Sequence, residues 1–238
     1  MKHFYGMIIC AALGALTALP ATAGKSSPVT PEESNRIIAL SFERGIELHK
    51  KYSGVESLRK EIISEFDPET KKLKSVSEVT MKRKDFFYST PEVEVLAYKK
   101  DGKEMEPSKF RVMKAMPLFP VFDEKGRDNY AITVTERITF NGRECYRVQV
   151  EPRKETSRHF RGSFLVTVRG METIYIEGTM AKLGFPIKEF RISLNTKNID
   201  NVPLTQTGKV HIRVNVPLFY PDTILESTLT TIETKLMK

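Results

Sequence analysis

Apolar and polar residues alternate most regularly on either side of Asn141-Gly142 in this chain of 238 residues. In residues 131–140 and again in residues 143–150, apolar side chains fall on one face of an extended strand and polar ones on the other. Asn-Gly suits a type I′ turn, because both central residues of that turn need positive φ. The pattern predicts an antiparallel β-hairpin with one buried and one solvated face.

The same alternation recurs before and after this hairpin, which indicates roughly ten strands in all. The further runs are residues 58–66, 75–88, 93–98, 164–168, 174–176, 190–194, 210–216 and 223–236. In the first of them the apolar positions are Leu58, Ile62 and Phe66. Glu61 and Glu65 fall between these positions and are expected on the solvated face.

Residues 31–50 have the period of an amphipathic helix instead. Thr30 can cap this helix, Pro31 fits its first position, and Glu33 completes a capping box. Gly45 weakens the second half by about 1 kcal/mol relative to alanine. The apolar stripe, which must be buried against the sheet, is Ile38, Phe42 and Ile46.

A second, weaker helical segment is expected over residues 107–116, followed by an apolar loop between prolines. The two pieces carry an apolar cluster that consists of Met113, Met116, Leu118, Phe119 and Phe122. Methionine suits adaptable ligand surfaces because it is flexible and polarizable. This cluster and the helix stripe are therefore the candidate ligand contacts. The alternative is that both groups fill the interior as ordinary core.

Many consecutive antiparallel strands should curl strongly, and the two helical pieces then fit inside the curl. The predicted fold is mainly β (α+β), with a strongly curved antiparallel sheet that forms an incomplete β-barrel and helices that cover its concave face. No linker or repeat divides the chain, so residues 24–238 are expected to form one domain.

Residues 1–23 have the features of a secretory signal peptide: a charged start, a short apolar run and an Ala-Thr-Ala cleavage site. The apolar run is short for a membrane span, although a retained anchor is the alternative. We therefore expect an exported, soluble protein. Cys145 would be its single thiol, so no internal disulfide is expected.

The chain carries 38 basic and 30 acidic residues, a formal net charge of +8. Its basic clusters are Lys71-Lys72-Lys74, Lys82-Arg83-Lys84 and Arg153-Lys154-Arg158-Arg161. They lack the interleaved aromatic residues of nucleic-acid sites, so no nucleic acid is expected. An anionic membrane surface fits them, because each lysine or arginine near such a surface contributes about 1 kcal/mol. The alternative is an ordinary solvated surface.

Catalytic and metal chemistry finds little support in the sequence. His49, His159 and His211 have no second ligand at metal spacing, and Cys145 lies alone in a strand. No nucleophile, nucleotide-binding or phosphate-binding motif occurs. The sequence therefore predicts no catalytic residue, no metal and no cofactor.

The order of motifs from Gly162 onward resembles the LolA-like family of bacterial envelope proteins. The residues that carry the resemblance are Gly162–Val168, Thr173–Met180, Gly184–Leu194, Val202-Pro203 and the alternating run to Val216, with Asn141–Pro152 upstream. The motifs are patterns rather than catalytic groups. Gly170 and Met171 depart from the family, in which many members have an acidic turn. The resemblance implies an incomplete β-barrel with a helical lid over an apolar cavity that takes acyl chains.

Two functions follow as hypotheses. The first is a periplasmic, non-enzymatic carrier or receptor that binds acyl chains of lipoproteins or lipids. The second is an envelope module, of the anti-sigma regulator type, that binds a partner protein without lipid cargo. An enzyme acting on lipid is a weaker third option, because no nucleophile and base converge in the sequence.

Overall fold

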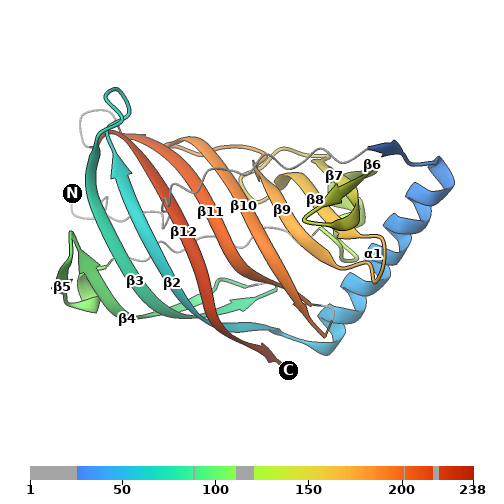
Figure 1. The fold of residues 1–238 in the computed structure, drawn as a ribbon, viewed down its shortest axis with the longest axis horizontal. Coiled ribbons are helices and arrows are strands. Elements are labelled where there is room, and N and C mark those ends of the chain that lie inside the picture. The colour runs from blue at the N-terminus through green and yellow to red at the C-terminus, as the bar shows by residue number, and fades with distance from the viewer. Residues whose placement is uncertain (1–25, 88, 111–120, 201, 217–219) are drawn as a thin grey trace.

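The computed structural model describes residues 26–87, 89–110, 121–200, 202–216 and 220–238. These residues form one long helix, α1 (Pro31–Lys51), and a single antiparallel sheet of 12 strands (Figure 1). The strand order is β1-β6-β7-β8-β9-β10-β11-β12-β2-β3-β4-β5. Each strand from β6 to β12 therefore pairs with its neighbour in sequence, and β12 then pairs with β2.

The strands are β1 (Ser27–Pro28), β2 (Gly54–Phe66), β3 (Leu73–Phe86), β4 (Glu92–Lys100), β5 (Lys103–Met105), β6 (Tyr130–Phe140), β7 (Arg143–Pro152), β8 (Phe160–Thr167), β9 (Thr173–Met180), β10 (Ile187–Ile199), β11 (Val202–Val216) and β12 (Tyr220–Met237). Two short helical turns, η1 (Pro107–Lys109) and α2 (Gly126–Asn129), complete the described elements.

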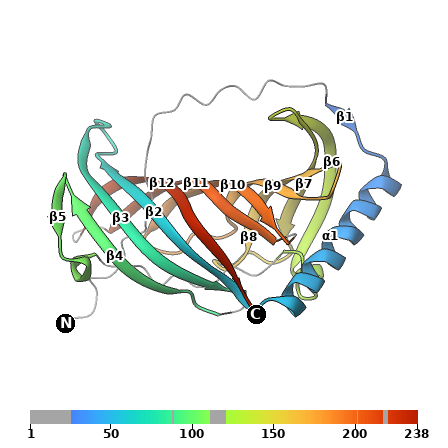
Figure 2. The same cartoon turned by 60° about the horizontal axis from the view of Figure 1, so that its bottom comes forward.

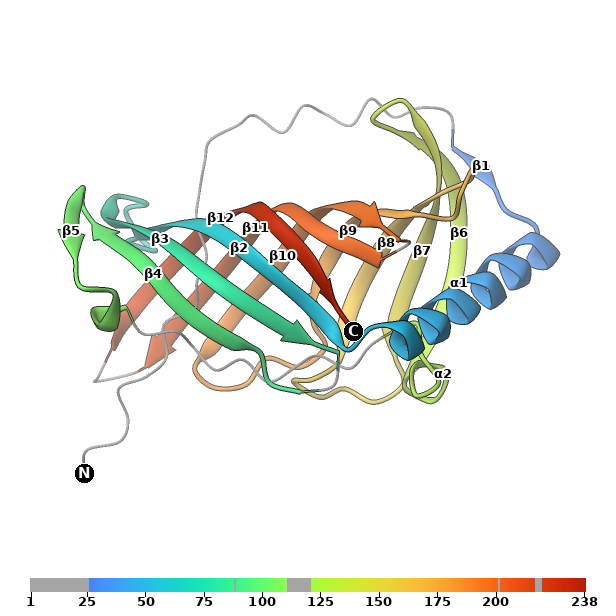
Figure 3. The same ribbon diagram turned by 90° about the horizontal axis from the view of Figure 1, so that it is seen from below.

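The sheet bends into an open trough with α1 beside β6 at one end and β4 and β5 at the other (Figures 2 and 3). This arrangement confirms the predicted incomplete β-barrel with a helix. Of the two predicted helical pieces, residues 31–50 are helical as α1. Most of the second, like the leader at residues 1–23, lies outside the described residues.

The central hairpin is the β6–β7 pair, and its turn has the predicted backbone. Asn141 has φ 50° and Gly142 has φ 75°, as a type I′ turn requires. The buried face of this hairpin, with Val148 and Val150 at 0% exposure, belongs to the main apolar cluster on the concave side of the sheet.

The concave face carries two apolar clusters that α1 does not cover equally. The larger cluster contains Ile37 of α1 and residues of β6 to β8. The smaller one, at the other end of the trough, consists of Ile63, Val79, Met81, Tyr98 and Phe110. No helix among the described residues is long and apolar enough to cross a membrane.

Candidate functional site

A cavity of about 410 Å³ lies between α1 and the concave face of the sheet, and we call it the helix cavity. The volume is within the range of about 300–1,000 Å³ that is typical of small-ligand sites. Its apolar lining is Leu48, Val55, Phe87, Val121, Phe122, Phe160, Phe164, Val166, Met171, Ile176, Ile192, Leu194 and Val202. A cavity lined in this way favours apolar over polar contents, because each Å² of apolar surface removed from water contributes about 25 cal/mol.

The N-terminal half of α1 anchors the helix. Thr30 caps it, since the Thr30 hydroxyl accepts a hydrogen bond from the Glu33 amide at 3.2 Å. Ile37 and Phe42 are its two buried residues, at 1% and 6% exposure. Residues 43–51 contribute Leu48 to the cavity wall and include no buried residue. The helix is thus held firmly at one end and lies over the cavity at the other.

Polar contacts fasten α1 at further points. The Arg44 guanidinium donates to the backbone carbonyls of Gly170 and Met171 in the β8–β9 turn. Just beyond the helix, the Tyr52 hydroxyl donates to the Asp200 carboxylate at 2.7 Å. These contacts are exposed or half-buried, so water can replace them at small cost.

Gly45 of α1 approaches the backbone of Phe122 so closely that a Cβ atom would lie 1.6 Å from the Phe122 carbonyl oxygen. The residue that weakens the helix on propensity therefore allows the helix to pack against the 121–125 segment. Phe122 in turn packs edge-on against Phe42 and Phe164, with ring centroids 5.9 and 5.4 Å apart.

A second close approach shapes the floor of the cavity. The Phe160 ring lies over Gly178, where a Cβ atom would be 2.4 Å from the ring, and over Gly162, where it would be 2.6 Å away. Two neighbouring strands thus leave room for one aromatic ring to lie flat on the sheet.

His49 lies where the helix cavity meets a smaller recess beside Asp123 and Lys125. Its ring is tilted against Phe87, with centroids 4.5 Å apart. Burial lowers the pKa of His49, and the nearby Asp123 carboxylate partly offsets that effect. The neutral imidazole is therefore the form that the folded protein favours.

The structure places the predicted ligand contacts differently from one another. Phe122 lines the helix cavity, Ile46 lines the smaller recess, and Ile38 and Phe42 pack against the core. The remaining predicted contacts, Met113, Met116, Leu118 and Phe119, lie outside the described residues. Ligand binding by any residue of the predicted set stays a prediction.

Most cavity residues were missed as ligand contacts because they come from strands. Phe164, Ile176 and Ile192 lie in runs that the sequence analysis interprets as ordinary alternating strands. Gly162 and Gly178 were the available signal, because glycine inside a strand often marks close approach.

The concave face of β2 and β3 carries a group of charged side chains. Arg59 donates from Nη2 to Asp85 Oδ2 at 2.6 Å and from Nε to Ser57 Oγ at 2.7 Å. Arg83 Nε donates to the other Asp85 oxygen at 2.6 Å. Burial lowers the pKa of Arg59, with a further contribution from Arg83, while Asp85 and Glu61 raise it. We call these residues the charged belt.

The sequence-based expectation that Glu61 lies on the solvated face is wrong. Glu61 is 7% exposed and points into the trough with Ile63, while Ile62 lies on the outer face. Both faces of β2 carry apolar residues, so the sequence of β2 alone does not determine which face turns inward. The pairing of Ile63 with Ser227 and of Glu61 with Leu229 on β12 fixes it.

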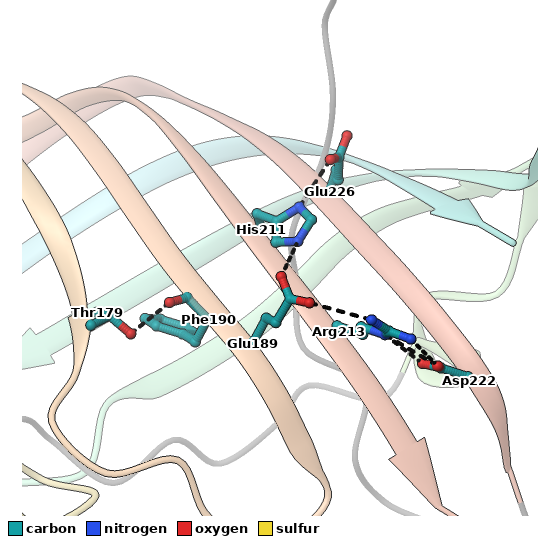
Figure 4. Close-up of polar contacts among 7 residues, drawn as sticks. All are labelled: Thr179, Glu189, Phe190, His211, Arg213, Asp222 and Glu226. Atoms are coloured by element: carbon teal, nitrogen blue, oxygen red, sulfur yellow. Dashed lines mark hydrogen bonds and ion pairs between the residues drawn. The ribbon is translucent and has the colours of Figure 1, made fainter. Parts of the chain in front are cut away.

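A second hollow, of about 720 Å³, lies on the outer face of β9 to β12. Its lining combines charged residues with Leu183, Phe190, Ile192 and Val210, and Figure 4 shows polar contacts among the side chains along β10 to β12. His211 contacts Glu226 at 2.9 Å and Glu189 at 3.6 Å, and Arg213 pairs with Asp222 and Glu189. In the same view the Thr179 hydroxyl donates to the Phe190 carbonyl at 2.6 Å.

Cys145 is completely buried, and burial raises the pKa of its thiol, which makes it a poor nucleophile. Within the described ranges no three histidine, cysteine or acidic residues could hold a metal ion together.

Comparison with known proteins gives similarity of structure alone. No family model and no curated protein matches the sequence. An outer membrane lipoprotein-sorting protein domain from Vibrio parahaemolyticus is similar, with 9% identity, a TM-score of 0.47, and coverage of 87% of this chain and 93% of that one. A LolA superfamily protein from Nitrosomonas europaea is 9% identical, with a TM-score of 0.41 and coverage of 86% and 94%.

A DUF1329 family protein from Desulfovibrio piger is 11% identical, with a TM-score of 0.41 and coverage of 84% of this chain and 92% of that one. The predicted resemblance to LolA-like proteins agrees with the names of two of these structures, which are similar at TM-scores below 0.5. It carries no argument about individual residues or about the ligand.

Proposed function

We propose that this protein is an exported, non-enzymatic carrier or receptor that binds acyl chains of lipids or lipoproteins in the helix cavity. The observation that supports this function best is the helix cavity itself, an apolar space of about 410 Å³ beneath the weakly buried half of α1. Capture would be driven by burial of acyl chains against the lining.

The polar groups of the cavity support binding rather than chemistry. Asn198 donates to the Thr173 carbonyl at 2.8 Å, and Arg44 donates to backbone carbonyls. These groups are engaged in holding the structure and lie at the edge of the cavity. An acyl chain that enters between them would keep its own polar end near the cavity mouth.

Release and entry would involve the C-terminal half of α1. Residues 43–51 contribute no buried side chain, and water can replace the polar contacts of Arg44 and Tyr52. Segments with few buried apolar contacts open at the lowest free energy. We therefore assign the role of a movable wall to residues 44–51.

The direct test is mass spectrometry of lipids that co-purify with gently isolated protein, followed by titration with a fluorescent fatty acid. Bound lipid and saturable uptake are the expected results. Absence of both would contradict the proposal.

A cavity-filling variant makes the test specific. Ile176 lines the cavity from β9, and Ile176→Trp should abolish uptake while the circular dichroism spectrum stays unchanged. Ile232, which is 55% exposed, provides the control variant Ile232→Trp, which should take up the probe normally. Equal uptake by the two variants would show that the probe binds elsewhere.

Binding of an envelope partner protein remains the second candidate, and the edge of β4 favours it. β5 pairs with Tyr98, Lys99 and Lys100 of β4 alone, so residues 92–97 have no described strand on that side. An open edge can accept a strand from a partner. Recovery of an envelope protein that survives detergent and depends on this edge, without co-purifying lipid, would favour this candidate.

A further inference from the structure

The basic clusters of the sequence differ from one another in how far their side chains are ion-paired. Lys82, Arg83 and Lys84 are paired with Glu56, Asp85 and Glu92, so that cluster is neutralised within the sheet. In contrast, Arg153 and Lys154 are exposed and have no ion-pair partner among the residues that the structure describes.

The β9–β10 loop adds to this second cluster. The backbone amide of Ala181 donates to the His159 carbonyl at 2.8 Å, which holds the loop beside residues 153–159. Lys182 and Lys188 of the loop region are exposed and have no described ion-pair partner either. Together, residues 153–159 and 181–188 contain five lysines or arginines and one acidic residue, Glu155.

The same loop presents the most exposed large apolar side chain of the described residues. Phe185 is 71% exposed. Hydrogen bonds brace the backbone around it, since the Ile187 amide donates to the Gly184 carbonyl at 2.8 Å and the Asn215 amide donates to the Pro186 carbonyl at 3.1 Å. The backbone that carries Phe185 is therefore fixed by hydrogen bonds, and its side chain is exposed to water in a defined position.

An isolated exposed apolar residue is normal on a protein surface. An aromatic side chain beside exposed cations such as Lys182 and Lys188 is a more specific combination, because it matches the two layers of an anionic bilayer surface. Lysine and arginine face the headgroups, and an aromatic ring enters the boundary of the acyl chains. An acidic protein surface would satisfy the cations but would offer the phenyl ring no apolar layer.

We propose that residues 153–159 and 181–188 form a docking surface for anionic phospholipid membranes, with Phe185 as the inserted side chain. This surface, the basic rim, lies away from the helix cavity, because none of its residues lines that cavity. Membrane docking is therefore separable from acyl-chain uptake.

The test is co-sedimentation of the full protein with vesicles of phosphatidylethanolamine and phosphatidylglycerol at low salt. Binding is expected there, and it should disappear with phosphatidylcholine vesicles or at about 1 M salt, where the Debye length is about 3 Å. The substitution Phe185→Ser should weaken binding about tenfold or more, and Lys182→Glu combined with Lys188→Glu should abolish it.

The other end of β10 supplies matched controls. Ile199 is 39% exposed, and Lys197 is exposed on the same strand. Ile199→Ser and Lys197→Glu should bind vesicles as the unmodified protein does. All proteins are isolated in the same way, so any contribution of residues outside the described ranges is common to them.

Failure of the unmodified protein to bind anionic vesicles, or equal binding by the rim and control variants, would contradict membrane docking by the basic rim. Uptake of the fluorescent fatty acid is measured on the same samples. Rim variants that take up the probe but do not sediment support the proposal, and the Ile176→Trp variant should still sediment. Each proposal can therefore fail without the other.

Discussion

The two ends of the trough differ in what fills them. Near β8 to β10 the concave face is aromatic and aliphatic, and α1 covers it but leaves the helix cavity. Near β2 and β3 the same face carries the charged belt and then a smaller apolar cluster. One sheet thus combines a region with space for an apolar ligand and a region whose surface is covered by ion-paired side chains. Four predictions test these roles.

The largest effects are expected from truncating buried side chains at the two ends. Ile37 of α1 and Met81 of β3 are 1% and 2% exposed. Ile37→Ala and Met81→Ala should each lower the free energy of unfolding by about 2–5 kcal/mol. Denaturant titration measures this loss. Only Ile37→Ala should also weaken fatty-acid uptake, because Ile37 anchors the helix that walls the cavity; an equal loss with Met81→Ala would contradict the division.

The charged belt should respond most strongly to loss of its shared anion. Asp85→Asn leaves Arg59 and Arg83 without their common partner, so we expect a loss of about 1–3 kcal/mol in unfolding free energy. Arg83→Met should cost less, since Asp85 keeps Arg59. Exchange of the Arg213–Asp222 pair on the outer face for a neutral pair is the control, at about 0–1 kcal/mol. Uptake should stay normal in all of these variants.

Gly45→Ala tests whether close packing outweighs helix propensity. Propensity alone would stabilise α1 by about 1 kcal/mol. We expect a net loss of about 1–3 kcal/mol instead, because the new methyl group collides with the Phe122 backbone and pushes the helix from the sheet. Gly184→Ala, where the added Cβ meets nothing within 4 Å, should change the unfolding free energy little. A stabilised Gly45→Ala protein would refute this reading.

The smallest effect is a pH dependence confined to the helix end. The folded protein lowers the pKa of His49 below its ordinary value of 6.5, so the unfolded chain binds the proton first. Stability from neutral His49 is complete above about pH 6.5 and is lost as the pH falls toward the lower folded pKa. His159 shifts in the same direction.

Hydrogen exchange measures this response residue by residue. Between about pH 7 and pH 5.5, exchange protection should fall in α1 and change little in β4, which contains no histidine and lies on the far side of β3 from β2. His49→Gln should flatten the response of α1. Uniform loosening of the whole sheet would argue against a local cause.

Much of the architecture could be predicted from the sequence, and the parts that could not have physical reasons. The alternation around Asn141-Gly142 and the capped helix at residues 31–50 are local patterns, and both are confirmed. The facing of β2 depends on its partner β12, which is far away in the sequence, so Glu61 was placed on the wrong face. Local pattern determines an element, while distant pairing determines its orientation.

The candidate site was harder to predict for a similar reason. A cavity forms where side chains from several elements leave space between them. The sequence of one element therefore does not reveal it. Phe122 was identified because it lies in an apolar cluster, whereas Phe164 and Ile176 were assigned to ordinary alternating strands. The glycines at 162 and 178 hinted at close approach but not at what would approach.

The seam between β2 and β12 joins Gly54–Phe66 to residues 224–237, which are far apart in the sequence. Synthesis must therefore pass β12 before the middle of the sheet can close. Until then the flanks of β2 and β11 remain open along their whole length, and open strand flanks invite aggregation. A chain that stops before β12 should precipitate instead of folding into a shorter, weaker version of this protein.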